Sequence, residues 1–125
     1  MSPAKLSFFK LIVRDLETSQ RFYEQAFGFT VSDRFDTPEF GEVILAQEDA
    51  GLSLILLSYK DGRALPDAAS HGPTGFLTGE IEATHAAIVA AGGTPKGPIL
   101  AIEGGVKVAF LADPEGHEIE LCQFP

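Results

Sequence analysis

The chain has 125 residues, of which 45% are hydrophobic and 22% charged, so a single globular domain is expected. Its 18 acidic and 9 basic side chains give a net charge of −9. This charge disfavours nucleic acid as a partner, because binding to phosphates needs a basic surface. The single cysteine, Cys122, excludes an intramolecular disulfide. No apolar run approaches the ~20 residues of a membrane span, and no signal-peptide pattern opens the chain, so a cytoplasmic protein without a membrane partner is expected.

The first half of the chain predicts a strand, a helix and three further strands. An apolar run at 6–13 predicts the first strand. Asp15 can cap the helix that follows, and Gly28 is suited to end it in the left-handed conformation. The three later strand-like segments are 29–35, 41–47 and 52–59. This half therefore has the order βαβββ.

The second half repeats this order after a connector at 60–72, which has no regular period. We therefore divide the single domain, 1–125, into half one (1–60), the connector and half two (73–125). The elements predicted in half two are a strand at 74–78, a helix at 81–91, a weak strand at 98–102 and strong strands at 106–112 and 117–124. Between the last two strands, Asp113 to Gly116 fits a type I turn.

The two halves match each other at a constant offset of 65 residues. Gly51–Tyr59 lies over Gly116–Phe124, and Phe8–Val13 lies over Pro73–Thr78. Two long copies indicate a duplicated supersecondary unit, because solenoid repeats are shorter and more numerous. Each half would be marginal alone, so the halves should share a core or exchange one with a second chain. We expect them to form a single binding cup.

Short motifs in both halves carry a resemblance to a known family. They are Val13-Arg14-Asp15-Leu16-Glu17, Phe22-Tyr23, Phe27-Gly28-Phe29, Ala86-Ala87-Ile88, Ala91-Gly92-Gly93 and Asp113-Pro114-Glu115-Gly116-His117-Glu118-Ile119-Glu120-Leu121. Through them the chain resembles the vicinal oxygen chelate superfamily, which comprises glyoxalases, bleomycin-resistance proteins and extradiol dioxygenases. The resemblance implies an α+β fold in which two βαβββ modules form an open, curled mixed sheet. It also implies a homodimer.

The resemblance further implies where a metal site would lie. In metal-using members, His, Glu, His and Glu come from the first and last strands of the two halves. The corresponding positions here are Phe8, Ile55, Pro73 and Glu120. One carboxylate does not make a catalytic zinc site, so neither a metal nor another cofactor is expected. His71 could replace Pro73 only after a two-residue strand shift that would disturb the side-chain faces.

Strand alternation predicts which side chains line the cup, because every second residue of a strand lies on the same face. Phe8 brings Lys10 and Ile12 to its own face, and Ile55 brings Leu57. The predicted ligand-binding residues are Phe8, Lys10, Ile12, Ile55, Leu57, Phe110 and Glu120. Apolar walls with few polar groups are typical of sites for small molecules.

Each of the main candidate residues has two interpretations. Lys10 is an anchor for a ligand carboxylate or carbonyl, or it forms an ion pair with Glu120 or another acid. Glu120 is a general base or a ligand acceptor, or it is an acid satisfied by Lys10 or water. Phe110 stacks on an aromatic ligand or belongs to the core. His117 has the opposite parity to Glu120 and is expected to be structural or exposed.

These observations favour a metal-independent protein that binds a small molecule and is similar to the bleomycin-resistance group. A second hypothesis is a metal-free enzyme that uses Lys10 and Glu120 for proton transfer beside a carbonyl. A third is a metal-dependent glyoxalase-like lyase or dioxygenase, and a fourth is an oligomer scaffold. The sequence leaves open whether the chain is an enzyme, which ligand it binds and how a dimer would be arranged.

Overall fold

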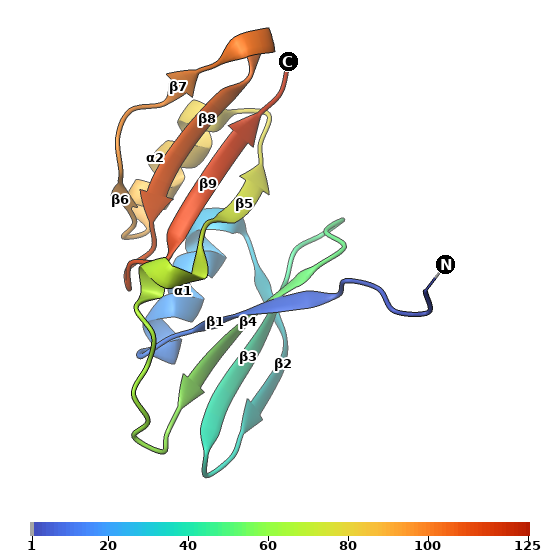
Figure 1. The fold of residues 1–125 in the computed structure, drawn as a ribbon, viewed down its shortest axis with the longest axis vertical. Helices are drawn as coiled ribbons and strands as arrows, with labels where there is room; N and C mark the ends of the chain where they lie inside the picture. Colours follow the sequence, from blue (N-terminus) through green and yellow to red (C-terminus); the bar gives the residue numbers. More distant parts are fainter. Residues whose placement is uncertain (1) are drawn as a thin grey trace.

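Two mixed β-sheets, each covered on one face by a helix, make up the fold (Figure 1). The computed structural model describes residues 2–125. The first sheet has the order β1 (Phe8–Ile12), β4 (Ser53–Tyr59), β3 (Phe40–Ala46) and β2 (Thr30–Asp36). The second has the order β5 (Thr74–Leu77), β9 (Glu118–Gln123), β8 (Lys107–Ala112) and β6 (Thr94–Pro95), and β7 (Leu100–Ala101) also pairs with β8. The helices are α1 (Leu16–Phe27), α2 (Ile81–Ala90) and two short 3₁₀ helices, η1 (Ala68–His71) and η2 (Glu103–Gly105).

The predicted α+β class and the repeated βαβββ order are confirmed, and the two sheets are open rather than closed into a barrel. Strand ends differ from the prediction by one or two residues. The weak strand predicted at 98–102 is shortened to β7 (Leu100–Ala101), and a two-residue strand that was not predicted, β6 (Thr94–Pro95), precedes it. Pro95 and Pro98 explain why the two are short and separate, because proline has no N–H to donate to the ladder with β8.

The offset of 65 residues holds at the level of strand register. In the first sheet, Lys10 of β1 lies opposite Ile55 of the parallel strand β4. In the second, Gly75 of β5 lies opposite Glu120 of the parallel strand β9. Since 10 and 55 become 75 and 120 when 65 is added, the two sheets pair in the same register.

Helix α1 begins and ends as the sequence predicts. The Asp15 carboxylate accepts the Thr18 backbone N–H at 3.0 Å, and Gly28 has φ 72° at the other end. Helix α2 begins after Glu80, whose side chain makes no capping bond. Between the halves, the rings of Phe27 and Phe76 stack with their centroids 3.9 Å apart. The halves therefore share one hydrophobic core. Neither helix in residues 2–125 is long and apolar enough to cross a membrane.

Candidate functional site

Five of the predicted binding residues share the face of the first sheet that lies away from α1. On β1, Leu11 is fully buried against the core, while Phe8 is 50% exposed, and strand alternation puts Lys10 with Phe8. Register then places Ile55 beside Lys10, and Leu57 beside Ile12. We call this surface, formed by Phe8, Lys10, Ile12, Ile55 and Leu57, the outer face of the first sheet.

Lys10 is paired on this face with an acid that was not among the predicted residues. Its Nζ lies 2.8 Å from Oε2 of Glu42 on β3, and the two side chains are 40% and 11% exposed. Lys10 Nζ also lies 5.7 Å from the centre of the Phe8 ring. The face thus carries a partly buried ion pair on an apolar surface. An acid next to Val43 in an otherwise apolar strand was the available signal for Glu42.

The other two predicted residues lie on the second sheet. Phe110 of β8 pairs with Glu120 of β9, on the face away from the core residues Leu111 and Ile119. The Cys122 thiol donates to Oε2 of Glu120 at 3.3 Å. Burial and the neighbouring carboxylate raise the pKa of that thiol. Lys10 and Glu120 therefore have separate partners on separate sheets.

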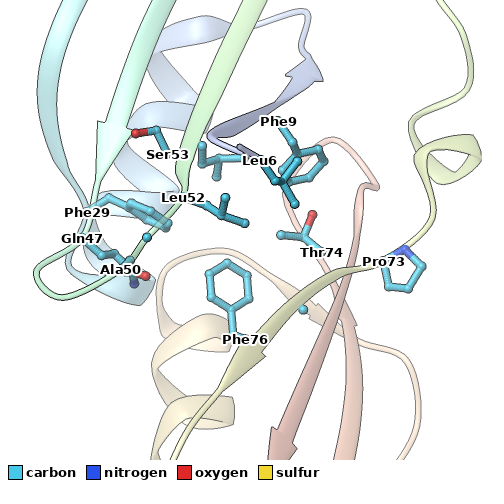
Figure 2. A pocket seen from close by; sticks show the side chains of 13 residues that line it. Leu6, Phe9, Phe29, Gln47, Ala50, Leu52, Ser53, Pro73, Thr74 and Phe76 are labelled. Carbon is cyan, nitrogen blue, oxygen red and sulfur yellow. The ribbon is translucent and has the colours of Figure 1, made fainter. Parts of the chain in front are cut away.

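A cavity of about 490 Å³ lies elsewhere, at the junction of the two halves (Figure 2). Leu52, Phe9 and Phe76 are among the side chains that line it. A second pocket of about 570 Å³ shares Gln47 and Ala50 with it. None of the seven predicted binding residues lines either space.

The donors in the structure do not fit the metal site that the family resemblance implies. Phe8 and Ile55 have no ligating atoms, and Pro73 stands directly before β5. Within residues 2–125 there is no group of three or more His, Cys, Asp or Glu side chains arranged to hold a metal. His71 lies in η1 rather than in β5, and its ring centre is 5.3 Å from that of His117. Burial and the charge of His117 lower the pKa of His71.

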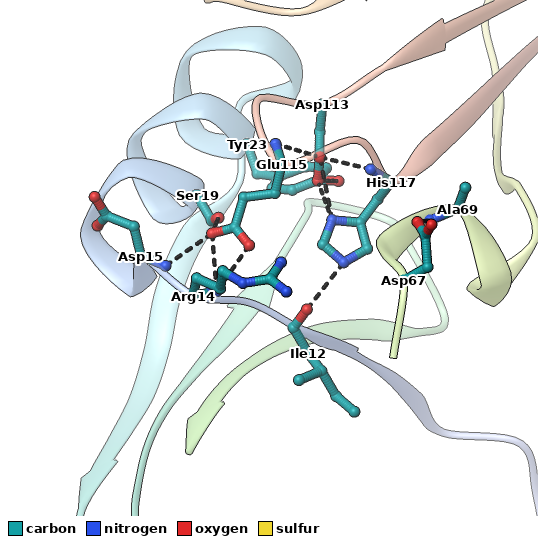
Figure 3. Close-up of polar contacts among 10 residues, drawn as sticks. All are labelled: Ile12, Arg14, Asp15, Ser19, Tyr23, Asp67, Ala69, Asp113, Glu115 and His117. Atoms are coloured by element: carbon teal, nitrogen blue, oxygen red, sulfur yellow. Dashed lines mark hydrogen bonds and ion pairs between the residues drawn. The ribbon is translucent and has the colours of Figure 1, made fainter. Parts of the chain in front are cut away.

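A buried polar network joins the β8–β9 turn to half one (Figure 3). His117 is 1% exposed, and its Nδ1 lies 2.9 Å from Oδ2 of Asp113. The Tyr23 hydroxyl donates to the same carboxylate at 2.8 Å, and His117 Nε2 lies 3.0 Å from the Ile12 carbonyl oxygen. All these polar groups have partners, as buried polar groups require. The prediction of a structural or exposed His117 is resolved as a structural, buried side chain.

The network fixes the charges of its members. Burial would raise the pKa of Asp113, but hydrogen bonds from His117 and Tyr23 and the charge of His117 lower it below its usual value. Burial would lower the pKa of His117, but the Asp113 carboxylate raises it. Burial and Asp113 raise the pKa of Tyr23 well above its usual value. At mildly acidic pH, His117 is therefore an imidazolium and Asp113 a carboxylate.

Glu115, from the same turn, binds the start of α1. Its carboxylate accepts the Arg14 N–H at 2.7 Å and the Asp15 N–H at 2.8 Å. It also accepts the Ser19 hydroxyl at 3.4 Å. The positive end of the helix dipole favours a carboxylate here. We call the contacts of Asp113, Glu115 and His117 with half one the sealed junction. From the sequence, Asp113 and Glu115 were predicted only to form a turn.

Comparison with known proteins identifies the family. The family model described as "Glyoxalase/Bleomycin resistance protein/Dioxygenase superfamily" matches residues 5–121. The chain belongs to this superfamily. Within the superfamily, a Vibrio parahaemolyticus protein described as a probable lactoylglutathione lyase is 32% identical over 98% of this chain and 93% of its own. A Haemophilus influenzae lactoylglutathione lyase is 30% identical over 90% of this chain and 87% of its own.

Solved structures agree with this assignment to the glyoxalase superfamily. A glyoxalase I mutant from Zea mays has a TM-score of 0.76 at 27% identity, covering 97% of this chain and 46% of that one. This chain thus spans less than half of the maize chain. A glyoxylase/bleomycin resistance protein/dioxygenase domain from Frankia sp. EAN1pec has a TM-score of 0.81 at 19% identity, which shows the shared fold. The resemblance drawn from the sequence motifs is confirmed.

Proposed function

We propose that this member of the glyoxalase superfamily binds a small molecule without a metal. The observation that carries the proposal is the set of side chains at the four expected ligand positions. Phe8, Ile55 and Pro73 supply no donor atom, and only Glu120 supplies one. A catalytic zinc needs three protein ligands, so the chemistry of this donor set does not support a metal centre.

The proposed binding surface is the outer face of the first sheet. Its apolar residues form a surface against which a ligand can bury apolar area, and the Lys10–Glu42 pair adds charged groups to this surface. A ligand carboxylate or carbonyl would approach Lys10, and a ligand N–H or O–H would approach Glu42. Glu120 and Phe110, from the outer face of the second sheet, would form the opposite wall of the cup.

We further propose that the protein is a homodimer in which these outer faces are covered. Large apolar side chains are strongly exposed on both sheets of the single chain. Phe8 is 50% and Phe35 49% exposed in the first sheet, and Leu77 is 78% and Leu100 47% exposed in the second. Extended exposed apolar surface marks an interaction site, and two-fold pairing of identical chains is the commonest assembly.

A second candidate function is catalysis. The observation that favours it is the 32% identity to a protein described as a probable lactoylglutathione lyase, over nearly the whole chain. In this case, Lys10 and Glu120 would transfer a proton beside a ligand carbonyl. Glu42 would compete for Lys10, since their ion pair is already formed in the structure.

The test is calorimetric titration with phenylpyruvate, an aromatic molecule that carries both a carboxylate and a carbonyl. Lys10→Met should weaken binding by about 1.5–3 kcal/mol, the range for a hydrogen bond to a charged group. The matched control is Lys60→Met, because Lys60 also pairs with an acid, Asp36, at the edge of the first sheet. Equal affinity in the wild type and Lys10→Met would contradict the proposed site. Turnover of a lactoylglutathione-forming substrate in EDTA, lost in Glu120→Gln, would favour the enzyme.

A further inference from the structure

The sealed junction has a counterpart on the other side of the molecule. Subtracting 65 from the Asp113–Gly116 turn gives the β3–β4 turn, Glu48–Gly51. Adding 65 to the Ile12–Asp15 corner gives Leu77–Glu80, between β5 and α2. The β3–β4 turn therefore faces the corner between β5 and α2, just as the β8–β9 turn faces the corner between β1 and α1. The 570 Å³ pocket lies between the β3–β4 turn and the β5–α2 corner and is lined by residues of both. We call this region the open junction.

The open junction lacks three of the groups that close the sealed one. Glu115, which binds two helix amides, corresponds to Ala50. His117 corresponds to Leu52, which is 46% exposed. Tyr23, which donates to Asp113, corresponds to Ile88. A methyl group stands in place of the Glu115 carboxylate and an alkyl chain in place of the His117 imidazole, so these two contacts cannot form here. Glu48 keeps a carboxylate at the Asp113 position, but its side chain forms no hydrogen bond across the junction among the described residues.

Beside the 570 Å³ pocket, and sharing Ala50 and Phe76 with it, lies an apolar cavity of about 490 Å³, within the usual size of small-molecule pockets. Its wall contains no charged side chain. The apolar side chains that line it are Leu6, Phe9, Phe29, Leu52, Leu54 and Phe76. Figure 2 shows Leu52 and Phe76 on opposite sides of the space. A ligand here would meet aromatic and aliphatic groups from both halves.

One buried polar atom of this wall is unpaired. Thr74 Oγ1 is buried and has no hydrogen-bond partner among the described residues. A buried hydroxyl without a partner costs free energy that a partner restores. The Gln47 side-chain amide, also in the wall, already donates to the Phe27 carbonyl at 2.9 Å. Thr74 thus offers an occupant of the cavity a buried hydrogen-bonding group.

From this geometry we propose that the 490 Å³ cavity beside the open junction is a second binding site, for an uncharged aromatic or aliphatic molecule with one hydrogen-bonding group. Anions are disfavoured because the cavity wall has no cation and the adjoining pocket is lined by Glu48 and Asp49. The site shares no residue with the outer face of the first sheet. A test of this site is therefore independent of a test of the proposed function.

A matched pair of fluorescent probes tests both the site and its preference for neutral ligands. N-phenyl-1-naphthylamine is uncharged, and 1-anilinonaphthalene-8-sulfonate is the same molecule with one sulfonate added. We expect the neutral probe to bind at least ten-fold more tightly. Ala50→Phe, which puts a ring into the cavity from its rim, should weaken the neutral probe at least ten-fold. Ala64→Phe, at an exposed alanine of the connector, is the control and should change nothing.

Two further variants keep the test decisive if Ala50→Phe fails to fold. Thr74→Val removes the hydroxyl and keeps the shape, so the neutral probe should lose about two- to ten-fold in affinity, as for one hydrogen bond. Leu52→Arg places a cation at the wall and should reverse the preference toward the sulfonate. Probe affinities that stay unchanged in all of the cavity variants would overturn the proposal. So would a wild type that takes up no neutral probe, or one that binds the sulfonate more tightly.

Discussion

The two junctions between the halves are built on the same backbone plan and differ in what fills them. At the sealed junction, Asp113, Glu115 and His117 bind half one through paired polar groups, of which Asp113 and His117 are buried. At the open junction, Ala50 and Leu52 occupy the corresponding positions, and a cavity remains. Duplication supplies the geometry twice, and a few side chains decide whether each copy is closed for stability or left open for a ligand.

The largest expected effect comes from breaking the sealed junction at its centre. Asp113→Ala removes the acceptor of Tyr23 and the partner of His117, and leaves a buried imidazole uncompensated. The free energy of unfolding should fall by about 3–5 kcal/mol, as when one member of a buried pair is removed. Urea denaturation measures it. Glu48→Ala, the corresponding change at the open junction, should cost less than about 0.5 kcal/mol. Similar losses in the two variants would contradict the comparison.

Removing the carboxylate that binds α1 should have an intermediate effect. Glu115→Ala leaves the amides of Arg14 and Asp15 without their acceptor. We expect a loss of about 1.5–3 kcal/mol in the free energy of unfolding, in the range for hydrogen bonds to a charged group. Glu115→Gln keeps an acceptor oxygen but not the charge, so it should lose less. If Glu115→Gln is as unstable as Glu115→Ala, the side-chain oxygen contributes nothing.

The pH dependence of stability should report the His117–Asp113 pair. The pKa of His117 is raised in the folded state, so its contribution is fully present below the unfolded pKa of about 6.5 and is lost as pH rises through the folded value. The lowered pKa of Asp113 contributes above about pH 4 and is lost as pH falls. Between these limits stability should be greatest. The loss on the alkaline side should be smaller than in Asp113→Ala, because a neutral imidazole keeps its hydrogen bonds.

Urea midpoints from pH 5 to 9 test this expectation. His71 does not produce the alkaline decline, because its lowered pKa gives a contribution that is lost only as pH falls. Asp113→Asn should flatten the decline, since it removes the charge that holds the proton on His117. A wild type whose stability rises from pH 7 to 9, above the range in which His71 contributes a change, would contradict the assigned charges.

The smallest effect compares two hydroxyl groups. Tyr23→Phe removes a hydroxyl that donates to Asp113 and should cost about 1.5 kcal/mol, the lower end for a bond to a charged group. Thr74→Val removes a buried hydroxyl with no partner and should change stability by less than about 0.5 kcal/mol, or raise it. Thermal and urea unfolding of both variants give the comparison. Equal costs would mean that Thr74 has a partner in solution.

Much of this arrangement was predictable from the sequence, because it follows from local patterns. The spacing of apolar residues, the Asp15 cap and Gly28 predicted α1, and strand alternation placed Phe8 and Lys10 on one face. The partner of Lys10 was not predictable, because Glu42 reaches it across an intervening strand whose register the sequence does not state. The roles of Asp113 and His117 depend on contacts with residues about a hundred positions away.

The offset of 65 residues contained a further signal. Laying the β8–β9 turn over the β3–β4 turn puts Glu115 on Ala50 and His117 on Leu52, which indicates that the two turns cannot make the same contacts. What the sequence could not supply was the partner of Glu115. The amides of Arg14 and Asp15 are backbone groups, and only the fold brings them to the turn.

The same comparison of halves underlies the central claim, that this glyoxalase-superfamily protein acts without a metal. The first-strand positions Phe8 and Pro73, and the last-strand positions Ile55 and Glu120, are related by the same offset. Elemental analysis of protein purified without chelator tests the claim most directly. We predict no stoichiometric zinc, nickel, manganese or iron. One equivalent of any of these metals per chain, lost in Glu120→Ala, would contradict the account.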